Sequence, residues 1–172
     1  MDNPQERLLS KDFIAGLIVG EGWFGLTVQK TPRLKTKYGF TLRPRFAIQM
    51  NDEETMSMLR ASLDAAGIAY HVPKDVTRVE IAGMKRMVRL TDWILPHLTG
   101  DKLRAAKIVR EFCDLRMSKK QSEPYGPDEF RLVDKIRAHN AGNGDKAGAS
   151  LGELRDVRLS QKNPQRLHAM HP

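Results

Sequence analysis

The chain begins with apolar residues at helical spacing. Ser10 has the properties of a helix N-cap, and Asp12 falls in the first turn, where a carboxylate interacts favourably with the helix dipole. The apolar positions that follow recur three and four residues apart and comprise Phe13, Ile14, Leu17 and Ile18. This pattern predicts a helix of about three turns that ends near the glycines around Glu21.

Two segments with period-two alternation come next. Across residues 23–31, Phe24, Leu26 and Val28 alternate with small or polar residues, which predicts a half-buried strand. Turn-forming residues follow, and residues 40–49 alternate again, with Arg43 and Arg45 among the polar positions. Together the two segments predict a hairpin with one apolar and one polar face.

The remainder of the chain predicts four more helices and a second, shorter hairpin. The expected hairpin has strands at 70–74 and 76–81, and the expected helices occupy 52–66, 84–95, 101–117 and 127–139. A glycine-rich segment, 141–150, has the composition of a flexible linker and precedes a short basic tail. We therefore expect one domain over 1–142 and a linker with a tail over 143–172.

The order of these elements predicts an α+β domain. Helix, strand, strand, helix, strand, strand, helix gives an antiparallel sheet whose helices pack on one face and leave the other face bare. No Asp or Glu occurs between Gly22 and Asn51, whereas the cations there are Lys30, Arg33, Lys35, Lys37, Arg43 and Arg45. A curved, basic ribbon of this kind fits the DNA major groove, although a solvated hairpin with edge lysines has the same composition.

Composition favours an intracellular protein with a polyanionic partner. The 172 residues have a formal charge of +8, so nucleic acid is the first partner to consider. The single cysteine, Cys113, excludes a disulfide framework and a Cys-rich zinc site. The N-terminus lacks the apolar segment of a signal peptide, and the longest apolar run, 13–19, is shorter than a membrane span. We therefore expect no membrane partner and a location in the cytoplasm, nucleoid or organelle matrix.

The polar positions of both hairpins are the candidate DNA contacts. Arg and Gln side chains can bond to base edges, and Arg and Lys can bind phosphates. The candidates are Thr27, Gln29, Arg33, Thr41, Arg43, Arg45, Lys74, Arg78 and Glu80. For Arg43 and Arg45, a bidentate guanine contact and phosphate binding are both open.

The first predicted helix contains two glycines one turn apart, Gly16 and Gly20. The pair leaves a flat stripe that a second copy of the helix can approach closely, with Phe13 and Leu17 as further candidate dimer contacts. Glu21 would then face its own symmetry mate, and converging carboxylates favour a divalent cation such as Mg²⁺. The alternative is that the glycines pack within the same chain and that Glu21 is an exposed end residue.

Residues 14–22, IAGLIVGEG, resemble the LAGLIDADG motif of homing endonucleases in its variant that ends Gly-Glu-Gly. The element order resembles the αββαββα core of that family, and residues 124–140 are similar to the C-terminal helical region of its single-motif members. Val19 replaces an Asp that is often found in the motif and is not the metal ligand. The resemblance spans residues 8–142 and implies a curved antiparallel sheet that forms a DNA-binding saddle, plus C-terminal helices.

The resemblance further implies a homodimer that makes a double-strand break in a long, near-palindromic DNA site, with Mg²⁺ or another divalent cation such as Mn²⁺. Glu21 falls on the family's metal-binding acid position, and Gln49 matches a polar residue at the end of the second strand, with Asn51 as the alternative. The family has a basic residue in the loop before its fifth helix. Ungapped alignment places Asp101 there, so Lys102 is the candidate. The rival functions are an intron-RNA maturase and a catalytically inactive DNA-binding protein on the same fold.

Overall fold

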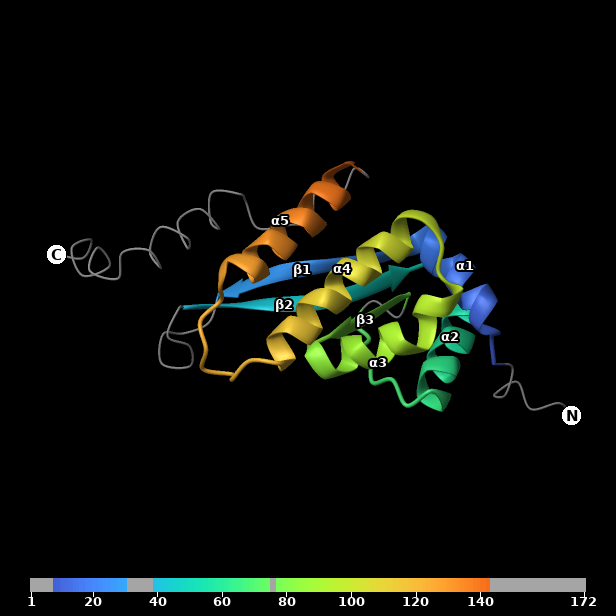
Figure 1. Cartoon of the computed structure of the whole chain (residues 1–172). Helices are drawn as coiled ribbons and strands as arrows, with labels where there is room; N and C mark the ends of the chain where they lie inside the picture. Colours follow the sequence, from blue (N-terminus) through green and yellow to red (C-terminus); the bar gives the residue numbers. More distant parts are fainter. Residues whose placement is uncertain (1–7, 31–38, 75–76, 143–172) are drawn as a thin grey trace, which may run out of the picture.

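The computed structural model describes residues 8–30, 39–74 and 77–142 (Figure 1). The elements in chain order are α1 (Lys11–Glu21), β1 (Gly22–Lys30), β2 (Phe40–Gln49), α2 (Glu53–Ala65), β3 (Arg78–Ala82), α3 (Met84–Ile94), the 3₁₀ turn η2 (Leu95–His97), α4 (Gly100–Met117) and α5 (Pro127–Gly142). The helices confirm those expected from periodicity. The candidate Arg33 and the segment 143–172 lie outside the described residues. Within the described ranges, no helix is long and apolar enough to cross a membrane.

The three strands form one antiparallel sheet in the order β1, β2, β3. Apolar side chains alternate onto one face, where Phe24, Leu42, Phe46 and Ile48 are almost completely buried. This face packs against α4, α5 and α3, and Figure 1 shows α4 lying across β1 and β2 with α5 beside β1. The fold is therefore the expected α+β domain, with the apolar face of its sheet covered by helices.

The second hairpin is shorter than the sequence predicted. Of its two expected strands only β3 forms among the described residues, and 70–74 contributes a single bridge in which His71 and Glu80 exchange backbone hydrogen bonds of 2.7 and 2.8 Å. The next bonded pair of an antiparallel ladder would join Pro73 to Arg78. Because proline has no backbone N–H, the ladder stops after one pair. The expectation of a strand at 70–74 is therefore wrong.

A second proline marks the place where β3 ends. Pro44 is buried in the middle of β2, opposite Leu26 of β1. A proline is rare in a central strand because it has no backbone N–H to donate to the neighbouring strand. On the other side of β2, β3 ends at Ala82, and the Gly83 N–H donates to the Pro44 carbonyl at 3.1 Å. Along 40–43, β2 therefore pairs with β1 alone among the strands that the structure describes.

A buried carboxylate joins α5 to the end of α4. Glu129 has no exposed surface, and it accepts hydrogen bonds from Arg116 at 3.1 Å, from Lys119 at 2.9 and 3.0 Å and from the Gly126 N–H at 2.9 Å. Burial raises the pKa of this carboxyl, but the bonds from Lys119, Gly126 and Arg116 outweigh burial and hold the pKa below its ordinary value of 4.5. The fold therefore stabilises the charged form of Glu129.

We expect Glu129→Gln to lower the free energy of unfolding by about 3 kcal/mol at neutral pH, because two cations lose their buried counter-charge. The pKa of Glu129 is lowered in the folded protein. Its contribution to the free energy of unfolding is therefore complete above the pKa of the unfolded chain and is lost as the pH falls through the pKa of the folded protein. Urea titrations of the wild type and the variant should therefore converge at acid pH.

The control for this measurement is Glu111→Gln, which removes an exposed carboxylate on α4 that pairs with Arg131 at 3.2 Å. Exposed pairs contribute about 0 to 1 kcal/mol, so this variant should differ little from wild type at any pH. A stability difference for Glu129→Gln that stays constant from neutral to acid pH would contradict the proposed linkage.

Candidate active site and nucleic-acid interface

α1 ends at Glu21 and β1 begins at the next residue, so this carboxylate lies at the corner between a helix and the sheet. Ser10 caps the start of α1 by accepting the Phe13 N–H at 3.2 Å. At the other end, a Cβ on Gly22 would lie 2.7 Å from the carbonyl oxygen of Ile18. The abrupt change from helix to strand therefore requires glycine at 22, and it leaves Glu21 exposed.

The glycine stripe of α1, formed by Gly16 and Gly20, is open. A Cβ built on either residue would meet no atom within 4 Å. On the same side of the helix, Phe13 is 52% exposed and Leu17 is half-buried. The described part of the chain does not pack on this stripe, so the alternative in which the glycines contact another helix of the same chain is wrong for these residues.

An open depression beside the stripe brings candidate site residues together. Gly16, Gly20 and Glu21 line it from α1, and Gln49 and Asn51 line it from the end of β2 and the turn that follows. Gln49 and Asn51 are both exposed, as Glu21 is. The acid and the two polar candidates, which are distant in sequence, therefore share one surface.

Asp52 also lines this depression, but its carboxylate is engaged in capping α2. It accepts the Thr55 hydroxyl at 2.6 Å and the Glu54 N–H at 3.1 Å. The bond from the Thr55 hydroxyl, followed by the backbone bond from Thr55, lowers the pKa of Asp52. Glu21 thus differs from Asp52 in having no structural role in a helix cap.

Lys102 contacts the same corner from α4. Its Nζ donates a hydrogen bond to the carbonyl of Gly22, the residue that follows Glu21. Lys102 lies in the first turn of α4, within the helix expected over 101–117, whereas the basic residue of the family lies in a loop. The neighbouring Asp101 pairs with Arg104 on the surface. A lysine that is distant in sequence therefore fixes the backbone next to the exposed acid.

One chain supplies few metal ligands at this corner. In the described ranges, no group of three or more His, Cys, Asp and Glu side chains comes together as a metal site. A hard cation such as Mg²⁺ needs several oxygen ligands, of which one or two are typically protein carboxylates. The exposed Glu21 fits such an ion if a second copy of the chain contributes its own carboxylate.

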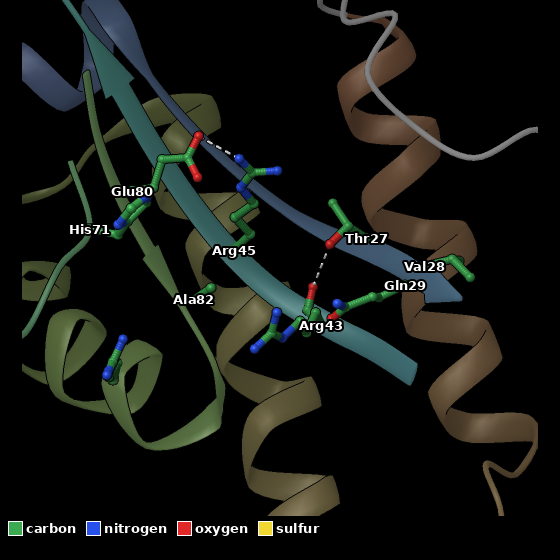
Figure 2. Close-up of a pocket in the computed structure, with 9 residues that line it drawn as sticks. Thr27, Val28, Gln29, Arg43, Arg45, His71, Glu80 and Ala82 are labelled. Carbon is green, nitrogen blue, oxygen red and sulfur yellow. Dashed lines mark hydrogen bonds and ion pairs between the residues drawn. The ribbon is translucent and has the colours of Figure 1, made fainter. Parts of the chain in front are cut away.

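The polar face of the sheet is built from alternate residues of all three strands. We use the name polar sheet face for Thr27, Gln29, Thr41, Arg43, Arg45, Arg78 and Glu80. Thr27 lies opposite Arg43 in the register and donates from Oγ1 to the Arg43 carbonyl at 3.3 Å (Figure 2). Gln29 lies opposite Thr41. These candidates are together as expected, whereas Lys74 is exposed in the segment before β3 and belongs to no strand.

Glu80 is the acid on this basic surface, and it pairs with two arginines. Its carboxylate accepts from Arg45 on the neighbouring strand (Figure 2) and from Arg78 on its own strand, the latter at 2.8 Å. The side chains of Arg45 and Arg78 are 33% and 37% exposed, and that of Glu80 is 15% exposed. Sequence reasoning treated these residues as separate contacts, but Glu80 orients the two arginines.

Trp23 lies near the start of β1, and its ring extends across Gly25. A Cβ on Gly25 would lie 2.2 Å from two ring carbons of Trp23, so the glycine makes room for the indole. The side chain is half-buried, and its Nε1 is buried with no hydrogen-bond partner among the described residues. The sequence signal for this packing is a glycine two positions after an aromatic residue on one strand face. Trp23 therefore packs along the strand at the end of the sheet that is nearest Glu21.

A family model described as LAGLIDADG endonuclease matches residues 14–115, which is more than half of the chain. The matched region contains the α1 motif, the sheet and almost all of α4. The protein therefore belongs to the LAGLIDADG endonuclease family. No curated protein matches the sequence.

Solved structures of homing endonucleases have the same fold at low sequence identity. I-CvuI, in complex with the uncleaved I-CreI target in the presence of Mg, has a TM-score of 0.66 at 15% identity over 88% of this chain and 92% of that chain. The archaeal intron-encoded I-Vdi141I, complexed with DNA, has a TM-score of 0.64 at 18% identity over 86% and 91%. I-SmaMI bound to cleaved DNA has a TM-score of 0.59 at 18% identity, over 91% of this chain but 48% of its own.

Proposed function

We propose that this protein is a site-specific, metal-dependent DNA endonuclease that acts as a homodimer. The main support is the position of Glu21, which is exposed at the end of the open glycine stripe and at the corner where the sheet begins. A second copy on that stripe would bring two Glu21 carboxylates together between two polar sheet faces. DNA lying along both sheets would pass over the pair of carboxylates.

A divalent cation suits this arrangement. Two Glu21 carboxylates, water and a phosphate oxygen are the ligands that Mg²⁺ and Mn²⁺ prefer. When bound, such an ion would supply Lewis-acid stabilisation of the scissile phosphate and of the leaving oxygen. Structures of I-CvuI with DNA were solved in the presence of Mg or Ca, which is consistent with a divalent cation at a site of this kind.

The other residues at the corner have distinct proposed roles. Lys102 holds the Gly22 carbonyl and so fixes the direction of Glu21, while it adds a positive charge beside the phosphate. Gln49 shares the depression with Glu21 and hydrogen-bonds the attacking water or a phosphate oxygen, with Asn51 as the alternative. None of these steps requires a His, Ser or Cys nucleophile.

The polar sheet face is the proposed DNA-binding surface. Arg43 is exposed, and Arg45 and Arg78 each keep about a third of their side chains accessible, so all three can reach base edges or phosphates. One ribbon covers about one helical turn of DNA, and two copies would cover about 20 to 24 base pairs. The favoured substrate is therefore double-stranded DNA with two related half-sites.

Cleavage of a DNA library with randomised sites of about 20 to 24 base pairs tests the proposal. We expect the wild type to cut a subset of the library with Mg²⁺ and none with EDTA. Glu21→Gln should cut about a hundredfold more slowly or worse. The reason is that the variant loses the carboxylate that would hold the metal ion, and this ion would stabilise the charge of the transition state by several kcal/mol. Binding to the selected sites should persist, since the polar sheet face is unchanged.

The matched control is Glu111→Gln, an exposed acid on α4 whose loss should leave both cutting and binding unchanged. Equal cutting by Glu21→Gln would contradict its role as metal ligand. Selective binding by a wild type that cuts nothing would exclude the nuclease and would indicate a DNA-binding protein instead.

The open stripe predicts the effect of a bulky residue at Gly16. A Cβ at Gly16 points into open space, and leucine favours a helix over glycine by about 0.8 kcal/mol, so we expect Gly16→Leu to leave folding of the single chain intact. Self-association measured by sedimentation should nevertheless weaken at least tenfold. Ala138→Leu places the same side chain at an exposed position of α5 and should leave association unchanged. Undiminished association of Gly16→Leu would exclude the stripe as the dimer contact.

Glu80→Gln tests how the polar sheet face discriminates between sequences. Without the carboxylate, Arg45 and Arg78 are free to bind phosphates. We expect tighter binding to random DNA, and a slope of log K against log salt that is steeper by about 1. Discrimination between selected and random DNA should fall. Glu111→Gln is the control, because it makes the same charge change away from the sheet. Weaker binding of Glu80→Gln to random DNA would contradict the proposed role of Glu80 in restraining the two arginines.

A further inference from the structure

The start of β2 is held by a residue from outside the sheet. Along 40–43, β2 pairs with β1 on one edge, and on the other edge the Leu42 N–H donates to the hydroxyl oxygen of Tyr125 at 3.0 Å. Leu42 is completely buried, so water does not satisfy this donor. Tyr125 lies between α4 and α5, in the segment that Figure 1 shows passing the beginning of β2.

Tyr125 makes a second contact with the same end of β2. Its ring stacks on Phe40, with centroids 5.6 Å apart and an interplanar angle of 26°. One side chain therefore holds the backbone at Leu42 and the side chain of Phe40. Two contacts on residues two positions apart in one strand restrict both its position and its twist.

The tyrosine is itself held by charged and aromatic neighbours. The Arg116 guanidinium lies 4.7 Å from the centre of the Tyr125 ring, and the Phe130 ring approaches it edge-on with centroids 6.5 Å apart. Arg116 in turn donates to the buried Glu129 at 3.1 Å. A continuous set of contacts therefore runs from Glu129 through Arg116 and Tyr125 to Leu42.

The residues on either side of Leu42 belong to the polar sheet face. Thr41 and Arg43 alternate with the buried Leu42, and they lie opposite Gln29 and Thr27 of β1. At about 3.3 Å per residue, Arg43 and Thr41 are about 20 and 26 Å along β2 from Gln49. These lengths correspond to about 6 and 8 base pairs of DNA.

We propose that Tyr125 is a positioning residue for the outer base pairs of the DNA site. It holds the backbone from which Thr41 and Arg43 reach DNA, while the other end of β2 is held by its pairing with β3. This inference rests on the proposed function. It assigns a role in sequence discrimination to a residue on the helix-covered side of the molecule, away from the polar sheet face.

Tyr125→Phe in the full chain tests this role. The variant keeps the ring that stacks on Phe40 and removes the oxygen that accepts the Leu42 N–H. A single mismatch in a DNA site typically weakens binding about 5- to 150-fold. We expect this penalty to shrink about two- to tenfold, the effect of one hydrogen bond, at the base pairs about 6 to 8 outward from the base pair nearest Gln49 in a site selected by the wild type. Penalties at inner base pairs and the cleavage rate at saturating DNA should stay unchanged.

Amide hydrogen exchange of the DNA-free protein gives a second readout. Exchange at Leu42 should be faster in Tyr125→Phe than in the wild type, because the N–H has lost its acceptor. The matched control is Tyr70→Phe, which removes a hydroxyl that donates to Asp64 at 3.1 Å and lies away from the start of β2. This control should change neither the exchange at Leu42 nor the mismatch profile.

Three results would overturn the inference. They are unchanged exchange at Leu42, an unchanged mismatch profile in Tyr125→Phe, and a loss of discrimination that is equal at inner and outer base pairs. A wild type that shows no site preference would instead overturn the proposed function itself. Failure of the Tyr125 inference can therefore be distinguished from failure of the proposed function. The exchange measurement needs no DNA, and the mismatch profile is first established with the wild type.

Discussion

The direct junction of α1 and β1 is the constraint on which the rest of the structure depends. No residue separates Glu21 from Gly22, and any side chain at 22 would collide with the Ile18 carbonyl, so helix and strand meet at a fixed corner. Lys102 reinforces this corner through its bond to the Gly22 carbonyl. The corner places one exposed carboxylate on the border of two open surfaces, the glycine stripe and the sheet. Under the proposed function, one short peptide therefore determines both where two copies meet and where DNA reaches the acid.

Strict alternation along the strands separates the buried core from the polar sheet face. Phe24, Leu42 and Phe46 bury one face against the helices, so substitutions on the polar sheet face leave the core intact. The cations of the polar sheet face are nevertheless not all free side chains. Glu80 holds Arg45 and Arg78 by ion pairs, which reduces their freedom to bind phosphates of any sequence. Under the proposed function, a basic surface with an internal acid favours discrimination between DNA sequences over tight binding to any sequence.

Local signals predicted most of the fold, and contacts between distant residues account for what was missed. Helical spacing and the cap at Ser10 located α1, and alternation located β1, β2 and their polar face. Pro73 was visible in the sequence, but its effect depends on the register of the His71–Glu80 bridge, in which it would pair with Arg78. The placement of Lys102 against Gly22 depends on tertiary packing between segments that no periodicity connects. Glu21 could be proposed as the site acid from sequence because its motif is local.

The two ends of β2 are held by different parts of the chain. At the Gln49 end the strand pairs with β3, within the region that matches the family model, whereas the Leu42 end depends on Tyr125, which lies beyond the matched residues 14–115. Under the proposed function, the inner base pairs are then contacted from a part of the sheet that the family pattern specifies. The outer base pairs are contacted from a part whose position depends on the α4–α5 segment. Changes in that segment would alter recognition of the outer base pairs without replacing any side chain of the polar sheet face.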